Sequence, residues 1–252
     1  MRKQLLFCLS LISLLLFATV IVSAQEGSKT GTAAAANGST GTAISATSTP
    51  VELARAALAG QGGDKYKNLT SMVLIGTVDL YAPNSTQSIP GKFVMVTAGD
   101  KMRIDIDARP AVSFKNIYNG QQSYSSMPGV NLPPMNKFGP IVLTKLDQPG
   151  YTVTALPDKK KQRAFRIADP DGNATEFYVD ATTGRIVTFL IPFNGYVFGT
   201  EIKKTKDIEG VIIPYNFTQR LEMTQGAFFA EYSVKDVKLN QPVGDDVFAI
   251  PN

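Results

Sequence analysis

The sequence predicts a mainly β protein: a curved antiparallel sheet, an unclosed half-barrel of about 11–12 strands, with a short N-terminal helix and a lid segment. From residue 71 onward, nearly every segment is rich in β-branched and aromatic residues and is bounded by Gly, Pro, Asn or Asp. The connections are short, which favours sequential antiparallel neighbours. A flat sheet of that many strands is disfavoured because strand twist makes it curl.

Residues 1–24 are predicted to be a signal peptide. Arg2 and Lys3 precede an apolar core at residues 5–22, and small residues end the segment at Ala24. The alternative is an uncleaved membrane anchor, since the apolar core is close to the lower length limit of a membrane span. We expect a periplasmic or secreted protein.

Composition excludes several kinds of chemistry. The chain has no His, and its one cysteine, Cys8, lies inside the predicted signal peptide. These absences exclude Ser-His-Asp catalysis, His-ligated zinc and, after signal removal, any thiolate site. With a net charge of +4, no Trp and no basic block interleaved with aromatic residues, nucleic acid is not expected as a partner. We expect no catalytic residues, metal or cofactor.

Residues 25–48 are rich in Ala, Gly, Ser and Thr and contain almost no large apolar residue, so we expect a flexible linker. It is either a plain spacer or a glycosylated stalk. The β domain is predicted to span residues 49–252.

A short helix is predicted to open the domain. Thr49 and Glu52 form the pattern of a capping box, Pro50 is suited to the first helical position, and Gly60 ends the helix. A short turn follows at residues 64–69. One apolar stripe should pack on the sheet, and it comprises Val51, Leu53, Ala54, Ala57 and Leu58.

The predicted strands differ in how many of their faces are apolar. Residues 211–221 and 228–234 alternate strictly, so these strands should have one face in water. The predicted strands cover residues 72–81, 92–98, 102–107, 112–118, 121–126, 151–156, 163–168, 175–180, 186–191, 198–206, 211–223 and 228–239.

The hairpin formed by residues 176–180 and 186–191 departs from simple alternation. Its loop, residues 181–185, contains Gly184 for a positive φ angle. Its second arm is apolar on both faces at Ile186, Val187, Phe189, Leu190 and Ile191. We therefore expect protein, a ligand or a partner to cover its second face.

Residues 127–150 interrupt the series of strands. Four prolines before Ile141 forbid a regular strand, yet the segment carries many large apolar residues. A loop of this length and apolar character should fold back over the sheet, with a helical turn near residues 141–146. It is either a movable lid over a pocket or a permanent plug of the core.

Two acidic patterns could carry chemistry. Asp105 and Asp107 share one strand face and could act as general acid and base, but the flanking Arg103 and Arg109 favour a solvated charge ladder. Residues 169–173 resemble the start of a calcium loop, but the bidentate Glu of such a loop is missing. A carboxylate hydrolase is therefore the weakest of the functional hypotheses.

Three groups of motifs resemble the LolA/LolB-like superfamily of outer-membrane lipoprotein-sorting proteins. They are LAGQGGDKYKNLTSM from Leu58 with Gly76-Thr77; PGKF from Pro90, KMRI from Lys101 and IYNGQQ from Ile117; and YVDATTGRIV from Tyr178, EGVIIP from Glu209 and DVF from Asp246. The resemblance implies an unclosed, strongly curved antiparallel β-barrel with a helical lid. In the characterised carriers of that superfamily, the interior holds acyl chains.

We therefore expect an exported carrier or sensor that binds lipid or lipoprotein acyl chains, and that is a monomer. The alternative is an envelope-stress sensing module with an envelope protein partner and no lipid cargo. The predicted ligand-binding residues are Phe93, Met95, Phe189, Ile191 and Tyr232 in the wall and Met135, Phe138, Ile141 and Val142 in the lid.

Overall fold

A computed structural model describes residues 44–127, 133–223 and 226–251, which belong to one compact unit. It contains a twelve-stranded antiparallel sheet and few helices, which confirms the predicted fold class. The strands are β1 (Ser71–Tyr81), β2 (Ser88–Ala98), β3 (Lys101–Ala108), β4 (Val112–Tyr118), β5 (Ser123–Ser125), β6 (Thr152–Ala155), β7 (Gln162–Ala168), β8 (Ala174–Asp180), β9 (Ile186–Phe193), β10 (Tyr196–Ile208), β11 (Val211–Met223) and β12 (Gly226–Leu239). The helices are α1 (Pro50–Gly60), α2 (Asp64–Lys67) and the 3-10 helices η1 (Met135–Lys137), η2 (Gly139–Lys145) and η3 (Asp245–Phe248).

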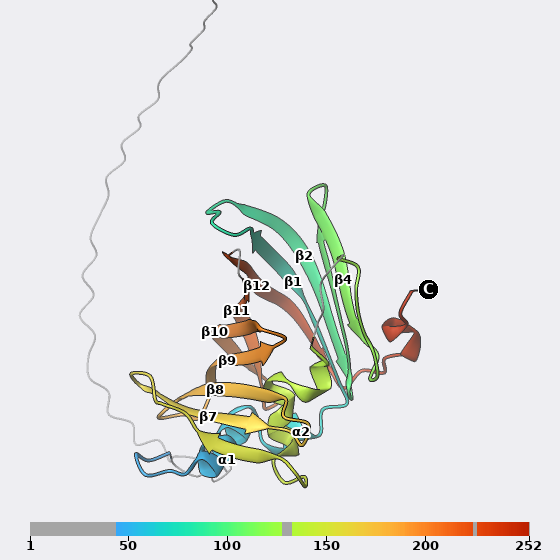
Figure 1. Ribbon diagram of the computed structural model, residues 1–252. Coiled ribbons are helices and arrows are strands. Elements are labelled where there is room, and N and C mark those ends of the chain that lie inside the picture. The colour runs from blue at the N-terminus through green and yellow to red at the C-terminus, as the bar shows by residue number, and fades with distance from the viewer. Residues whose placement is uncertain (1–43, 128–132, 224–225, 252) are drawn as a thin grey trace, which may run out of the picture. The chain divides into compact units, whose positions relative to one another are not determined.

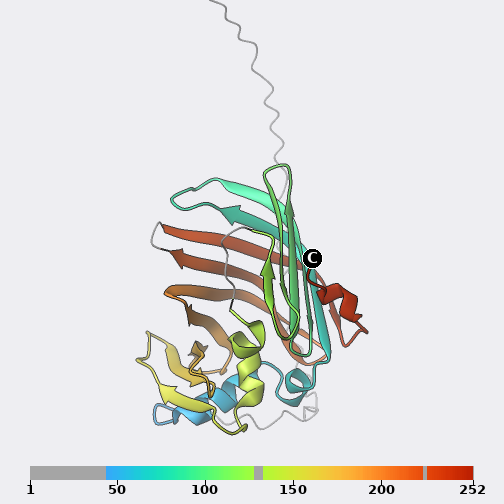
Figure 2. The same ribbon diagram turned by 45° about the vertical axis from the view of Figure 1, so that its right-hand side comes forward.

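The sheet consists of two meanders that meet at its centre. The strand order is β5-β4-β3-β2-β1-β12-β11-β10-β9-β8-β7-β6, so the first and last strands pair with each other. The edge strands β5 and β6 are consecutive in the chain, and the segment between them carries η1 and η2. The twist turns β1–β4 steeply against β7 and β8 (Figures 1 and 2). We call the face that carries Phe93, Phe177 and Tyr232 the inner face, and the opposite one the outer face.

Helix α1 begins with the predicted capping box. The Thr49 hydroxyl accepts from the Glu52 backbone N–H at 3.3 Å, and the Thr49 N–H donates to the Glu52 carboxylate at 2.7 Å. The helix packs against β6, β7 and η2 through Leu53, Ala54 and Ala57, as expected.

The predicted stripe of α1 was wrong at one position. Val51 is 40% exposed, and Ala56 is buried in its place. The cause is the β8–β9 turn, which approaches α1 so closely that a Cβ on Gly184 would lie 2.8 Å from the Ala56 carbonyl oxygen. Gly184 also has a φ of 70°. Glycine is therefore favoured here for two reasons: the backbone conformation, and the lack of space for a side chain.

The β8–β9 hairpin forms as predicted, but a β-bulge accounts for part of its apolar pattern. Ile186 pairs with Val179 and Thr188 pairs with Tyr178, so Val187 is an extra residue. The bulge places Ile186 and Phe189 on the same, inner face, where both pack in one cluster. On the outer face, the expectation of a cover therefore concerns Leu190. This side chain is half-buried beside Gly199 of β10.

The strand boundaries differ from the predictions mainly at the hairpin tips. Strand β2 begins at Ser88 rather than at residue 92, and Pro90 pairs with Asp79 of β1. This is possible because the pairing of β2 with β3 starts only at Lys92, so the missing N–H of Pro90 is not needed. Strand β5 is shorter than predicted, and β10 is longer.

The C-terminal strap, residues 243–250, covers the outer face of β1–β4 (Figure 1). Phe248 is 2% exposed and packs with Val96 and Ile117. Polar contacts fix the strap: Lys101 Nζ lies 2.6 Å from the Asp245 carboxylate, and Arg103 Nη1 donates to the Val247 carbonyl oxygen at 2.9 Å. The sequence did not predict this strap.

Within the described ranges, the helices are all too short or too polar to cross a membrane.

Candidate functional site

An aromatic group forms the inner wall on the central strands. The Phe93 and Tyr232 rings meet edge to face with centroids 5.0 Å apart, and Phe217 stacks on Tyr232 at 4.6 Å. All three are at most 4% exposed and belong to one apolar cluster over β1–β3, β11 and β12. Burial raises the pKa of the Tyr232 hydroxyl well above its ordinary value. This part of the wall is closely packed.

A second aromatic group continues the inner face across β7–β9. The Phe165 and Phe177 rings stack at 5.2 Å, and Phe177 lies 6.4 Å from Phe189. Helices α1 and η2 cover this group, and Val142 and Leu143 of η2 are at most 1% exposed within it. Helix η2 therefore closes this end of the inner face.

The lid, residues 135–145, is attached to both halves of the sheet. The predicted lid segment also includes residues 128–132, which lie outside the described residues. Lys137 pairs with Asp171 at the β7–β8 turn, and Lys145 Nζ lies 3.7 Å from the Asp100 carboxylate at the β2–β3 turn. The Gly139 N–H donates to the Thr175 hydroxyl at 3.0 Å. The lid thus bridges the two ends of the sheet.

Phe138 joins the lid to the wall. Its side chain is 2% exposed, and its ring meets the Phe193 ring of β9 edge to face at 5.7 Å. The next residue, Gly139, has a φ of 74° and lies beside the Phe189 ring.

The nine predicted ligand-binding residues are all buried or half-buried. The cluster over the central strands contains Phe93, Met95 and Tyr232, and the cluster beneath α1 and η2 contains Ile141, Val142 and Phe189. Of the others, Phe138 and Ile191 are buried, and Met135 is half-buried in η1. The structure therefore places six of the nine residues in two packed clusters and Phe138 between lid and sheet.

The inner face continues beyond these clusters into an apolar row near the β9–β10 and β11–β12 hairpin tips. We call this the open row; it crosses four strands and consists of Ile191, Phe198, Leu221 and Phe228, each paired with the next. Ile191 is buried, Phe198 and Leu221 are half-buried, and Phe228 is 43% exposed. Of these four, only Ile191 was a predicted site residue. The strict alternation of β11 and β12 was the signal that could have extended the site to Leu221 and Phe228.

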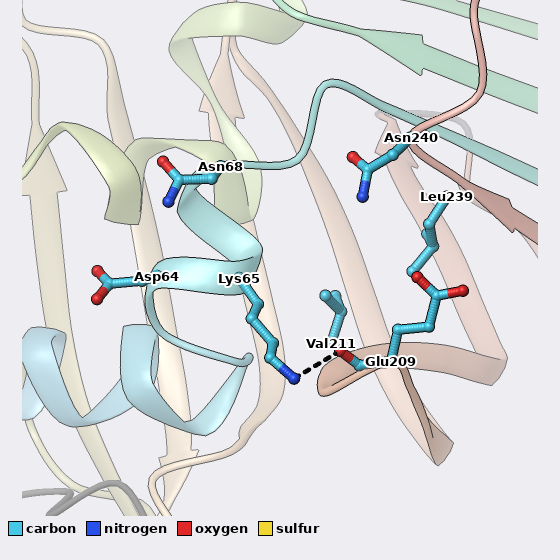
Figure 3. Close-up of a pocket in the computed structure, with 7 residues that line it drawn as sticks. All are labelled: Asp64, Lys65, Asn68, Glu209, Val211, Leu239 and Asn240. Atoms are coloured by element: carbon cyan, nitrogen blue, oxygen red, sulfur yellow. Dashed lines mark hydrogen bonds between the residues drawn. The ribbon is translucent and has the colours of Figure 1, made fainter.

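A pocket of about 360 Å³ lies at the other end of β11 and β12 (Figure 3). Lys65 Nζ donates to the Glu209 carbonyl oxygen at 3.0 Å across it, and its floor is formed by the buried Val211 and Leu239. The rim consists of exposed polar side chains: Asp64, Lys65, Asn68, Glu209 and Asn240. It contains none of the predicted ligand-binding residues.

A second pocket, of about 340 Å³, lies along β2–β4 and includes Asp105 and Asp107. Each carboxylate is paired with an arginine two residues away in the chain, Asp105 with Arg103 and Asp107 with Arg109, both at 2.6 Å. The side-chain hydrogen bond from Arg109 lowers the pKa of Asp107 to about 2. A general acid needs a raised pKa, so this geometry favours the charge ladder over hydrolysis.

The Asp169 carboxylate is hydrogen-bonded within its own turn. The Asp169 carboxylate accepts from the Asp171 N–H at 3.0 Å, from the Asn173 N–H at 2.8 Å and from the Asn173 side-chain amide at 2.8 Å. These donors occupy the oxygens that a calcium loop would offer to a cation. The described residues bring together no group of three Asp or Glu side chains that could hold a metal.

Comparisons with known proteins identify the fold. No family model matches the sequence, and no curated protein matches it. A LolA superfamily protein from Nitrosomonas europaea superimposes with a TM-score of 0.53 and 11% identity, over 81% of this chain and 99% of that chain. A putative outer membrane lipoprotein-sorting protein domain from Vibrio parahaemolyticus gives a TM-score of 0.50 and 13% identity, over 79% and 95%. The predicted resemblance is thereby confirmed at the level of the fold: the chain has a LolA-like fold.

Proposed function

We propose that this chain is an exported carrier or sensor that binds lipid or lipoprotein acyl chains on the inner face of its half-barrel. The observation that carries the proposal is the open row, which extends the packed inner wall to the solvent at Phe228. A contiguous apolar surface on the concave side of a sheet is typical of a ligand-binding site. Export follows from the signal peptide predicted at residues 1–24.

The chemistry of the open row favours a hydrocarbon ligand. Its four side chains are apolar, so they offer burial and no charge or hydrogen bond. At about 0.8 kcal/mol for each buried methylene, a chain of about a dozen carbons contributes roughly 10 kcal/mol before ordering costs. The name of one structural neighbour, a putative outer membrane lipoprotein-sorting protein domain, is in keeping with such a ligand.

The proposal is tested by native mass spectrometry of the exported protein, followed by organic extraction and lipid analysis. We expect a bound acyl species near a one-to-one ratio. An empty protein that also fails to take up a fluorescent fatty acid would contradict the proposal. A stoichiometric envelope protein in pull-downs, without extractable lipid, would instead favour the interaction module.

Replacement of Phe228 by serine is expected to weaken binding of a fluorescent fatty acid about 5–10-fold, because one apolar contact of the open row is lost. Phe228 is 43% exposed, so stability should change little. The matched control is Phe229→Ser: Phe229 is 37% exposed on the outer face, where the Arg220 guanidinium lies 5.2 Å from its ring centre. Affinity should remain within about twofold of the wild type in this control. Equal losses in titrations of both variants would show that the inner face does not bind the chain.

A further inference from the structure

The ends of three neighbouring hairpins, β1–β2, β9–β10 and β11–β12, lie together at one edge of the sheet. The strand register places the last two at one level, because Val197 near the start of β10 pairs with Glu222 near the end of β11. The β1–β2 loop adjoins them, since a Cβ on Gly226 of β12 would lie 3.0 Å from Pro83 Cβ. Figure 2 shows the three hairpin ends along one side of the sheet.

This edge carries three of the five exposed large apolar side chains of the described residues. Tyr196 is 38% exposed, Phe228 43% and Phe229 37%. Phe228 lies on the inner face and Phe229 on the outer face, because successive side chains of a strand alternate. We call these three side chains, together with the β1–β2 loop at residues 82–87, the tip edge. An acyl chain on the inner face would cover Phe228 and leave Phe229 exposed, so the acyl site does not explain the whole edge.

The tip edge also lacks charge. Residues 80–91, 186–200 and 223–230, which contain the three hairpin ends, include no Asp, Glu, Lys or Arg. The opposite ends of the same strands are highly charged, as in the sequence KKTKDIE at residues 203–209, before the β10–β11 turn. Moving a charged side chain out of water is costly, whereas exposed aromatic side chains gain free energy on leaving it. The tip edge is therefore the part of the central strands that can enter an apolar phase.

The charges nearest to the tip edge indicate which phase this is. Three are acidic and two are basic: Asp79, Glu222, Glu231, Lys92 and Arg220. The Arg220 guanidinium pairs with the Glu222 carboxylate at 3.1 Å. A surface that binds anionic lipids has an excess of Lys and Arg, and the tip edge has none. Its Tyr and Phe side chains are suited to the boundary between lipid headgroups and acyl chains, which attracts them without net charge.

We infer that the tip edge docks on a zwitterionic lipid surface, with Tyr196, Phe228 and Phe229 at the boundary of headgroups and acyl chains. Phe228 is also the last residue of the open row, so docking would connect the inner face with the apolar part of the bilayer. The inference goes beyond the proposed function, because it adds a membrane surface as a partner and does not require a bound acyl chain.

The first test is flotation of the exported protein with phosphatidylcholine vesicles. The wild type should float with the vesicles, and the double variant Tyr196→Ser with Phe229→Ser should bind them at least about tenfold more weakly. The matched control is Val51→Ser, because Val51 is 40% exposed on α1; it should bind like the wild type. Wild-type binding should change less than about twofold at high salt, or when phosphatidylglycerol replaces part of the lipid. A loss of more than about tenfold at high salt would show binding through charge and would overturn the inference.

The second test locates the docked part of the molecule and needs no aromatic substitution. The only cysteine of the chain is Cys8, inside the predicted signal peptide, so a single cysteine can be introduced and labelled with a polarity-sensitive dye. A dye on Thr86→Cys, in the exposed β1–β2 loop, should shift its emission to the blue when vesicles are added. A dye on Lys238→Cys, at the other end of β12, should not shift. Shifts at both positions, or at neither, would overturn the inference.

The outcomes separate the inference from the proposed function. Phe229→Ser alone should weaken vesicle binding about threefold or more, although it keeps the affinity for a soluble fatty acid. A wild type that does not float, or a double variant that floats equally well, would overturn the inference and leave the acyl site standing. Normal flotation without fatty-acid uptake would contradict only the proposed function. A wild type that sediments as a dimer and does not float, with a monomeric double variant, would show that a second copy covers the edge and would overturn the inference.

Discussion

Replacement of Phe248 by alanine is expected to lower the free energy of unfolding by about 3–5 kcal/mol, the usual cost of removing a buried phenylalanine side chain. Phe248 is 2% exposed between the C-terminal strap and the outer face of β1–β4, where Val96 and Ile117 are also buried. Without the ring, the strap leaves a cavity over these strands, and their outer face becomes accessible to water.

Urea denaturation of the wild type and the variant would measure this effect. The control is Ile250→Ala at a half-buried position of the same strap, where a loss of about 1–2 kcal/mol is expected. If Phe248→Ala cost no more than Ile250→Ala, the strap would contribute little to stability and the sheet would be stable without it.

Replacement of Phe138 by aspartate is expected to detach the lid from the sheet. A carboxylate at this buried position beside Phe193 has no partner, so docking should become less favourable by about 3 kcal/mol or more. This corresponds to roughly a hundredfold in the docking equilibrium. Hydrogen exchange would detect it at the Gly139 N–H, which donates to Thr175 in the docked lid. A fluorescent fatty acid should also dissociate faster, since the lid no longer retains it.

The conservative variant Phe138→Leu should keep the lid docked, because it preserves the apolar contact at a cost below about 1.5 kcal/mol. Unchanged ligand content in Phe138→Asp, with the fold intact, would show that the lid does not retain ligand. Loss of the entire fold would show that the segment is a plug and part of the core.

The fold was predictable because strand alternation is a local property. Phe217 and Tyr232 were correctly placed on one face of their strands, where they now stack. The capping box of α1 was predictable for the same reason. The bulge at Val187 was not, because a one-residue insertion changes which face each side chain takes without changing composition.

The candidate site was less predictable, because it depends on which segments cover which part of the sheet. Val142 was expected in the lid and proves to be packed in the cluster under α1, an arrangement set by tertiary contacts. Alternation placed Leu221 and Phe228 on the same strand faces as Phe217 and Tyr232, but it did not predict that they form one row with Ile191 and Phe198, because that depends on the pairing of four strands.

The pairing of β1 with β12 has a consequence for biosynthesis. Thr70 and Asn240, which hydrogen bond beside this pair, are 170 residues apart in the chain. Contacts of such long range form slowly, and until the last strand is made, β1 keeps an unpaired edge in the middle of the future sheet. A chain that stops before β12 would expose the edges of β1 and β11 together, as a target for proteases and a template for aggregation. Completion of synthesis is thus a condition for a continuous twelve-stranded sheet, because the final strand joins its two halves.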